Sequence, residues 1–306
     1  IHERLVGSEM CIRDRVSVFT AISAFCNAGF DLFGRFGAYS SLVPYVNNYY
    51  VQAVIMFMIM AGGLGFMVWV ELAEYRKKRR LSLHAKVVLQ FSVIFWVGGA
   101  VLLALLEWSN PRTMGGLSVP GKIMAALFQS VSTRTAGMNT IDLAACSPIS
   151  KLLMSVLQFI GAAPGSTGGG VKVTTFAVLI LTIRSVAQGR DDCVIGGHHI
   201  ESKTVYRALT IIVIGAVAAF GSAVVVYYNT AETVSVIDCI FESCSAFGTV
   251  GLSVGVTGQL NTGAKLLYMA CMFMGRVGPV SLAISLTAKP DDNKRKVLPV
   301  GHINVG

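Results

Sequence analysis

The sequence has few charged residues for its length. Only 13% of its 306 residues are Asp, Glu, Lys or Arg, whereas 54% are hydrophobic and the mean hydropathy is +0.65. A soluble domain carries roughly 25% charged residues, so most of this surface does not face water. The composition excludes an ordinary soluble enzyme and indicates an integral membrane protein.

Patterns that signal chemistry are also missing. The seven cysteines form no CxxC pair and have no regular spacing, which favours buried free thiols over disulfides or a metal site. Acidic residues are nearly absent from the apolar stretches, which leaves no paired carboxylates or metal cluster for catalysis within a membrane. We therefore expect no enzyme activity, no catalytic residue and no covalent cofactor.

The basic residues are present but separated. The formal net charge is +9, and nucleic-acid-binding proteins would spread such charge over one folded face. Here Lys and Arg sit between long apolar runs instead. This arrangement predicts a multi-pass protein of the cell (cytoplasmic) membrane, with the lipid bilayer as partner and no nucleic acid.

Long apolar runs are plentiful. A membrane-spanning helix needs about 20 mostly apolar residues, and five stretches qualify: 50–72, 87–106, 152–183 (interrupted), 209–228 and 264–286. Three basic clusters, at 76–86, 184–207 and 289–296, fall on one side if each unit between them crosses, dips and crosses back. The positive-inside rule makes that side cytoplasmic. Shorter semi-polar stretches such as 16–30 then enter the membrane from outside as re-entrant segments.

A threefold internal repeat organises the chain. Ser-Ala-Phe-Cys-Asn-Ala-Gly-Phe (23–30) resembles Ser-Thr-Arg-Thr-Ala-Gly-Met (132–138), with one gap, and Ser-Ala-Phe-Gly-Thr-Val-Gly-Leu (245–252). The glycines at 29, 137 and 251 are 108 and 114 residues apart. Each unit therefore predicts a helix, a short re-entrant helix, a glycine-containing extended loop and a second helix. The first unit lacks its leading helix.

These loops suit a cation filter. A cation that crosses a bilayer exchanges its hydration shell for protein oxygens, which backbone carbonyls supply without a fixed charge. Aligning successive carbonyls requires unusual torsions that glycine permits. Thr249-Val250-Gly251 reproduces the start of the potassium-channel filter. The alternative, close helix packing through small residues, does not require bracketed repeats on one membrane face.

A glycine-rich stretch at 161–175 interrupts an apolar run. Pro164 and its glycines would make a continuous helix costly there, since Pro costs about 3 kcal/mol and each Gly about 1. We interpret it as an intramembrane gate loop below the filter. The alternative is a glycine-rich turn or phosphate cradle, but Lys172 is followed by Val173, so the P-loop pattern is absent.

These motifs resemble the Trk/Ktr/HKT potassium transporter superfamily, and more closely its Ktr membrane subunits. The resemblance rests on the three repeats, Gly-Ala-Ala-Pro-Gly-Ser-Thr-Gly-Gly-Gly-Val-Lys (161–172), Gly-Arg-Val-Gly-Pro (275–279) and the ending Ile-Asn-Val-Gly (303–306). It implies an all-α membrane protein with helix–pore loop–helix units around a pseudo-fourfold pore, of which three filters are present here. It also implies transport of potassium, with sodium left open, by a homodimer that a cytosolic nucleotide-binding subunit gates.

The resemblance assigns residues to two sites. The expected filter comprises Asn27, Ala28, Gly29, Phe30, Thr135, Ala136, Gly137, Met138, Thr249, Val250, Gly251 and Leu252. The expected gate comprises Gly165, Ser166, Thr167, Gly168, Gly169, Gly170, Lys172 and Arg276. Met138 replaces a phenylalanine usual in the family and is expected to pack behind the filter. Arg276 lies in an apolar helix near mid-membrane, where a charge predicts a function; Arg134 and Glu242 either pair to brace the filter or face the outer vestibule.

The repeat divides the chain into four parts. We expect a non-native or unstructured segment at 1–15, a second pore unit at 16–80, a third with the gate loop at 81–203, and a fourth with a tail at 204–306. A chain with three filters of four is expected to be a fragment and inactive alone. The main alternative function is a secondary transporter of another monovalent cation that uses broken helices.

Overall fold

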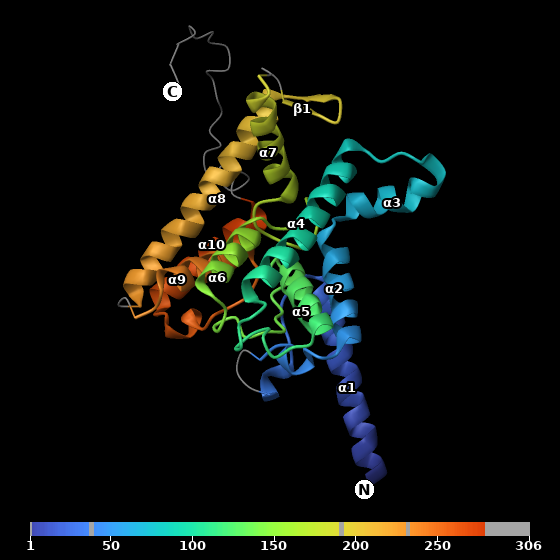
Figure 1. The fold of residues 1–306 in the computed structure, drawn as a ribbon, viewed down its shortest axis with the longest axis vertical. Coiled ribbons are helices and arrows are strands. Elements are labelled where there is room, and N and C mark those ends of the chain that lie inside the picture. Colours follow the sequence, from blue (N-terminus) through green and yellow to red (C-terminus); the bar gives the residue numbers. More distant parts are fainter. Residues whose placement is uncertain (1, 37–39, 190–192, 231–232, 279–306) are drawn as a thin grey trace.

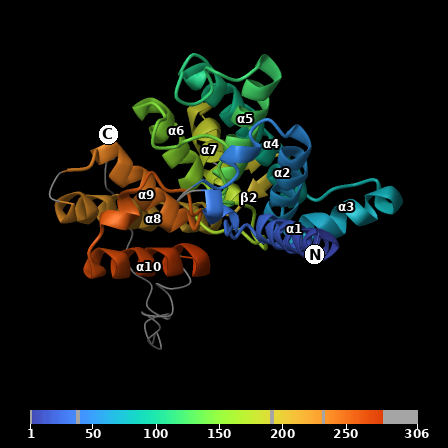
Figure 2. The same cartoon turned by 90° about the horizontal axis from the view of Figure 1, so that it is seen from below.

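The computed structural model describes residues 2–36, 40–189, 193–230 and 233–278. Its helices and strands form three successive groups around a centre (Figures 1 and 2). The elements are α1 (His2–Phe25), η1 (Phe33–Phe36), η2 (Val43–Tyr45), α2 (Tyr49–Gly63), α3 (Phe66–Lys78), α4 (Leu83–Glu107), α5 (Val119–Ser132), α6 (Pro148–Phe159), α7 (Val173–Ala187), β1 (Cys193–Ile195), β2 (His198–Ile200), α8 (Ser202–Asn229), α9 (Val236–Gly248), η3 (Val256–Gln259) and α10 (Thr262–Val277).

The repeat predicted from sequence is visible in the helix order. In the last two units a long apolar helix, α4 or α8, packs on a short pore helix, α5 or α9. The pore helix leads into a filter segment, and α6 or α10 follows. The first unit has α1 as its pore helix and α2 after the filter. Neighbouring units then join in one sense around the centre, because α2 packs on α5 and α6 packs on α9.

Helix starts follow local capping. The side chains of Ser82, Ser118 and Ser147 each accept a hydrogen bond from a backbone N–H in the first turn of α4, α5 and α6. Pro120 and Pro148 occupy the first turn of their helices, where proline costs no backbone hydrogen bond. These signals fix where each re-entrant or spanning segment begins.

Two helices, α4 and α8, are by themselves long and apolar enough to cross a membrane among the described residues. The predicted span 50–72 is not one straight helix, because α2 and α3 meet at an angle of 99°. The span 152–183 is interrupted as predicted, since thirteen residues separate α6 from α7. Only the part of 264–286 up to residue 278 is described.

The termini differ from expectation in one respect. Residues 2–15 are helical rather than unstructured, since they continue into the pore helix as α1; whether they are native stays a prediction. The third basic cluster at 289–296, Pro279 and the tail 303–306 lie outside the described residues. The turn between α3 and α4, the end of α7 and the start of α8 lie toward one end of the molecule, and the loops after the filters lie toward the other (Figure 1). These three segments carry Arg79 and Arg80, Arg184, and Lys203.

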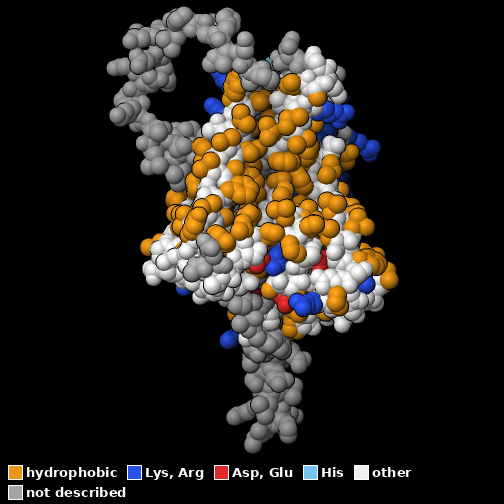
Figure 3. Space-filling view, turned by 60° about the vertical axis from the view of Figure 1, so that its left-hand side comes forward, with side chains coloured by type: hydrophobic (Ala, Val, Ile, Leu, Met, Phe, Trp, Pro, Cys, Tyr) orange, Lys and Arg blue, Asp and Glu red, His pale blue; other side chains and the backbone are white. Residues whose placement is uncertain are grey.

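The surface agrees with a membrane environment. Hydrophobic side chains cover a broad middle band, with Lys and Arg gathered mainly at its upper edge (Figure 3). Exposed apolar residues of α4, α8 and α10, such as Val97, Val217 and Phe273, contribute to this lipid-like coat. On the face that Figure 3 shows, charged side chains lie mainly above and below this band, which is the pattern that a bilayer selects.

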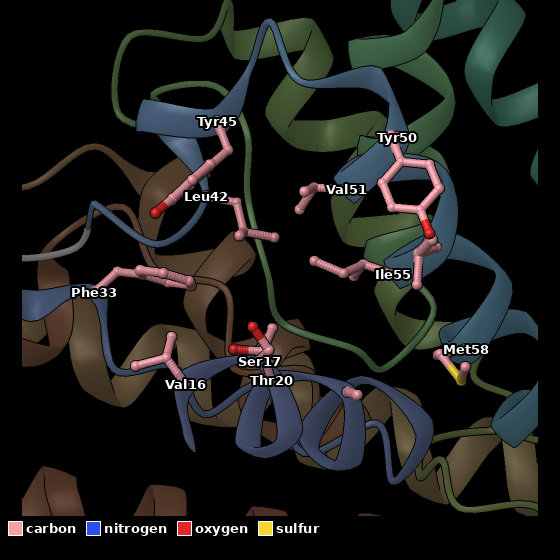
Figure 4. Close-up of a pocket in the computed structure, with 12 residues that line it drawn as sticks. Val16, Ser17, Thr20, Phe33, Leu42, Tyr45, Tyr50, Val51, Ile55 and Met58 are labelled. Atoms are coloured by element: carbon pink, nitrogen blue, oxygen red, sulfur yellow. The ribbon is translucent and has the colours of Figure 1, made fainter. Parts of the chain in front are cut away.

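An apolar cavity of about 380 Å³ lies in the first unit between α1, α2 and the segment that joins the filter to α2 (Figure 4). Val16, Thr20, Phe33, Leu42 and Ile55 are among the side chains that line it. The four filter residues of this unit are not in its lining. The cavity therefore lies beside the filter segment and not within it.

Candidate functional site: a three-segment filter above a glycine loop

The three filter segments share one backbone conformation. The first residue of each, Asn27, Thr135 or Thr249, has a positive φ of 49°, 80° or 53°. The glycine two residues later, Gly29, Gly137 or Gly251, again has a positive φ, of 72°, 79° or 93°. Non-glycine residues rarely adopt such torsions. The recurrence at matching positions shows that the repeat preserves a specific backbone shape.

The segments converge at their glycines. A Cβ added to Gly137 would lie 2.1 Å from the carbonyl oxygen of Val250 and 3.2 Å from the Cα of Gly29. A Cβ on Gly29 would lie 2.8 Å from the carbonyl oxygen of Ala136. Since real Cβ atoms essentially never approach that closely, only glycine fits at this junction. The three sequences, more than 100 residues apart, therefore present their backbones to one axis.

Each segment is held by a serine at the equivalent position of its repeat, a role that the sequence analysis did not predict. Ser23 Oγ donates to the carbonyl oxygen of Phe30 at 2.7 Å, and Ser245 Oγ donates to that of Leu252 at 2.7 Å. Ser132 Oγ likewise donates to the carbonyl oxygen of Met138. The signal was available, because a serine opens all three aligned motifs. Its hydroxyl closes the loop over the end of the pore helix.

The side chains of the second and third filter segments are mostly buried, whereas Ala28 and Phe30 of the first are exposed. Ala136, Met138 and Val250 are fully buried, and Met138 packs in a core cluster with Phe33 and Leu42, as its predicted place behind the filter requires. The side-chain polar atoms of Asn27 and the hydroxyl of Thr135 are buried and have no hydrogen-bond partner among the described residues. Such unpaired atoms are available to a cation or its water.

The pore helices end at the filter. The carboxyl ends of α1, α5 and α9 lead directly into the segments at 27, 135 and 249. The C-terminus of a helix carries about half a negative elementary charge. Three such ends around one axis favour a cation there.

The glycine-rich loop lies against the inner end of the filter. A Cβ on Gly168 would lie 2.2 Å from Thr135 Oγ1, and a Cβ on Gly169 would lie 2.2 Å from Thr249 Oγ1. The loop is fixed by backbone bonds from Ala163 N to Gly63 O, at 3.0 Å, and from Gly170 N to Gly275 O, at 3.1 Å. The residues after α6 therefore cross the axis directly beneath the filter.

Two positively charged side chains donate hydrogen bonds to this loop. The guanidinium of Arg276 donates to the carbonyl oxygen of Thr167, and Lys172 Nζ donates to that of Gly168 at 2.6 Å. Arg276 is in the last turn of α10, and Lys172 is the residue just before α7. The structure thus brings Arg276 to the loop across more than 100 residues of sequence. It is exposed on its other side.

Arg134 and Glu242 do not pair with each other, so the interpretation that they pair to brace the filter is wrong. Arg134 donates to the carbonyl oxygen of Gly161 at 2.6 Å and lies over the ring of Phe95 at 4.9 Å. Glu242 instead accepts four hydrogen bonds from the loop after the last filter segment. The donors are Ser253 Oγ, Val254 N, Val256 N and Thr257 Oγ1, at 2.6 to 3.1 Å.

Glu242→Gln is expected to destabilise the chain strongly. The buried carboxylate accepts three of its four hydrogen bonds at one oxygen, and the fourth, from Thr257 Oγ1, at the other. An amide replaces one of these oxygens with an NH2 group and removes the charge, so the bond from Thr257 is lost and the others are no longer charge-assisted, a contribution of about 1.5–3 kcal/mol each. We expect the free energy of unfolding to fall by about 3 kcal/mol. Thermal unfolding of the purified chain in detergent measures this. Glu74→Gln, which removes half of an exposed pair with Lys78, is the matched control; equal effects of the two variants would contradict the structural role of Glu242.

Above the filter, the loops that follow all three segments surround an open cavity of about 470 Å³. Its lining includes Ser40, Asn139, Asp142 and Ser253. Ser40, Asn139 and Ser253 come from different units, so the cavity lies on the pseudo-symmetry axis at the outer mouth. Its walls mix apolar side chains with these polar groups, and the carboxylate of Asp142 would attract a hydrated cation before it reaches the filter.

The sequence of the chain is similar to those of known cation transport proteins. The profile of a family described as "TrkH: Cation transport protein" matches residues 6–296, so it starts within the segment predicted to be non-native. The chain is 34% identical over 290 residues to Ktr system potassium uptake protein B of Bacillus subtilis, covering 95% of this chain and 63% of that protein. It is 38% identical over 277 residues to the protein of the same name of Vibrio alginolyticus, covering 90% and 59%.

The fold agrees with a solved structure. The potassium transporter TrkH of Vibrio parahaemolyticus superposes with a TM-score of 0.70 at 20% identity, over 87% of this chain and 56% of that one. The chain thus spans about 60% of the length of the relatives it matches. Because the family profile covers nearly all of it, the chain belongs to the TrkH family of cation transport proteins.

Proposed function

We propose that this chain forms most of a potassium-uptake pore in the cell membrane. The observation that carries the proposal is the recurrence of one glycine-centred backbone shape in three units that meet on one axis. The filter comprises Asn27–Phe30, Thr135–Met138 and Thr249–Leu252, whose carbonyls replace the hydration shell of the ion. Two relatives are named as potassium uptake proteins, and a third, of Enterococcus hirae, as a potassium/sodium uptake protein, so sodium stays a second candidate ion.

The glycine loop 165–170, with Lys172 and Arg276, is the gate in this proposal. The loop lies on the inner face of the filter at Thr135 and Thr249. Two positive side chains hold its carbonyl groups at Thr167 and Gly168. A loop in this position blocks a cation by volume and by charge, and glycine permits it to move without side-chain clashes.

A fourth unit completes the pore in this proposal. Between adjacent units, the helix after one filter packs on the next pore helix, as α2 does on α5 and α6 on α9. By the same rule α1 would receive a further helix and α10 a further pore helix. Ile22 of α1 and Met269 of α10 are each 59% exposed, as expected of faces that await such partners. The word "system" in the relatives' names supports further components. In this proposal they are a second copy of the chain and a cytosolic nucleotide-binding regulatory subunit.

Potassium-dependent growth tests the function. The chain, joined to the N-terminal unit of its native gene, is expressed in cells that lack their own potassium uptake. We expect rescue at low potassium, and we expect Gly251→Asp to abolish it, because a carboxylate on the axis binds the cation too tightly and the residue has a φ of 93°. Rescue that survives this substitution would contradict a path through this filter.

A second candidate, the broken-helix transporter of another monovalent cation, has one supporting feature. The α6–α7 interruption places unwound backbone at membrane depth, as such transporters do. It predicts uptake of sodium without potassium. Uptake of each ion by the purified protein in liposomes separates the two functions.

A further inference from the structure

Helix α3 leaves the direction of the membrane-crossing helices. It turns by 99° from α2 after a break at Leu64 and Gly65 and extends sideways from the bundle (Figure 1). Gly65 makes the turn with a φ of 83°, and a Cβ there would lie 2.5 Å from the carbonyl oxygen of Pro164. The bend is therefore built into the contact between α3 and the gate loop.

The side chains of α3 suit a membrane surface. In its first half Phe66, Met67 and Val70 are 60%, 55% and 55% exposed, while Val68 is fully buried against α4. Its last turn carries Arg76, Lys77 and Lys78, and Arg79 and Arg80 follow directly. A short helix with an exposed apolar part and a basic end, at the edge of the hydrophobic band, is typical of segments that lie in the headgroup region.

Most of this basic charge is unpaired. Glu74 binds Lys78 at 2.5 Å, and Glu71 accepts hydrogen bonds from the backbone and hydroxyl of Ser82. Among the described residues no ion pair involves Arg76, Lys77, Arg79 or Arg80. Four positions within five residues thus carry unpaired positive charges toward the side predicted to be cytoplasmic. That leaflet is rich in anionic lipid.

The same helix contacts the gate loop. Phe66 N donates to the carbonyl oxygen of Gly165 at 3.1 Å, and a Cβ on Gly165 would lie 2.9 Å from the Phe66 ring. Trp69 Nε1 donates back to Ala61 O of α2 at 2.8 Å, which fixes the bend. A groove of about 370 Å³, lined by Phe66, Met67, Glu71, His84, Pro164 and Gly165, opens at this junction. Movement of α3 is thereby transmitted to the start of the loop.

We propose that α3 is a membrane-surface helix that binds anionic phospholipid headgroups through Arg76, Lys77 and Arg80 and, when bound, restrains the gate loop through the Phe66–Gly165 contact. The lipid contact stands on the charges and exposure of α3 alone. The regulatory consequence rests on the proposed gate. A soluble acidic protein is the competing partner for the same charges.

Quenching of Trp69 tests the lipid contact. Trp96→Phe and Trp108→Phe leave Trp69 as the one tryptophan whose fluorescence is measured. Trp69 lies on α3 and is 41% exposed. The chain is reconstituted with brominated phosphatidylglycerol mixed into phosphatidylcholine, and the relative binding constant is read from the quenching curve. We expect anionic lipid to be preferred, with the preference falling about fivefold for each basic residue lost. Arg76→Gln, Lys77→Gln and Arg80→Gln together should lower the preference by roughly a hundredfold, with Arg79 still present.

The matched control neutralises an equal charge elsewhere on the same side. Arg184→Gln, Lys203→Gln and Arg207→Gln together remove three exposed cations at α7 and α8. These substitutions should leave the preference at Trp69 unchanged. A wild-type binding constant near one, at low salt, would overturn the proposal and leave the basic cluster to a soluble partner. An equal fall in both triple variants would show general attraction and also overturn it.

Hydrogen exchange tests the transmission to the gate. Amides of 165–171 are compared in nanodiscs of phosphatidylglycerol and of phosphatidylcholine. We expect at least severalfold slower exchange in the anionic lipid, lost in the Arg76/Lys77/Arg80 variant and kept in the control. Equal amide exchange rates in the two lipids would contradict the proposal that bound lipid restrains the gate loop. Neither measurement uses ion flux, so a failure of potassium rescue would count against the proposed function and not against this lipid site.

Discussion

Gly137→Ala is expected to abolish selective potassium uptake. The added methyl would lie 2.1 Å from the carbonyl oxygen of Val250, an oxygen that points to the axis in the neighbouring unit. Contact at a normal distance requires the two segments to separate by roughly 1 Å. The residue must also keep a φ of 79°, which costs a non-glycine residue about 1–2 kcal/mol. Both effects act on the carbonyl geometry that replaces the hydration shell.

Rubidium uptake into liposomes, with sodium as competitor, measures this loss in the protein that carries its N-terminal unit. Gly98→Ala is the control, because Gly98 lies in α4 with nothing within 4 Å of an added Cβ. That variant should transport normally, since alanine favours the helix. Unchanged selectivity of Gly137→Ala in a correctly folded protein would show that the glycine junction is not the ion path.

The backbone shape of the three candidate filter segments could be predicted because its physical requirement is local. A backbone that turns through positive φ needs glycine at Gly29, Gly137 and Gly251, so the requirement appears in the sequence, and a threefold recurrence makes it readable. The interruption between α6 and α7 was predictable for the same reason, since Pro164 and its glycines disfavour a helix. A requirement of the local backbone is therefore visible in the residues at that position of the sequence.

Contacts between segments that are distant in the sequence cannot be recognised from the local residues. The sequence 50–72 is apolar throughout, so it was predicted as one span, although the bend at Gly65 is imposed by the gate loop a hundred residues away. Arg134 and Glu242 were open to pairing by charge alone. In the structure the guanidinium binds Gly161 and the carboxylate binds its own following loop. Opposite charges indicate which residues could pair, but the packing of the helices determines which of them do.

Helical content was also underestimated at the N-terminus. The charged residues of 1–15 argue against a membrane span, and that argument holds, but charge does not prevent a helix in water. Continuity with the pore helix extends α1 back to His2. The hairpin of β1 and β2 was not predicted either, because two three-residue strands are too short for a period of two to be visible.

Arg276→Gln is expected to raise the potassium flux about tenfold. Its guanidinium donates to the carbonyl oxygen of Thr167, and a charge-assisted hydrogen bond contributes about 1.5–3 kcal/mol. If that bond exists only while the loop lies beneath the filter, its loss shifts the closed–open equilibrium tenfold for each 1.4 kcal/mol. Lys265→Gln on the same helix removes an equal, exposed charge away from the loop and should leave the flux unchanged.

Gly169→Ala should raise the flux from the other side of the same loop. Its methyl would lie 2.2 Å from Thr249 Oγ1, so the loop cannot keep its place under the filter. Once either change has displaced the loop, the other has little left to disrupt, and the double variant should conduct no more than the stronger single one. Additive increases would instead mean that Arg276 and Gly169 act on separate barriers. A decrease in flux in Arg276→Gln would assign the arginine to holding the pore together, because its bond to Thr167 would then be needed in the conducting state as well.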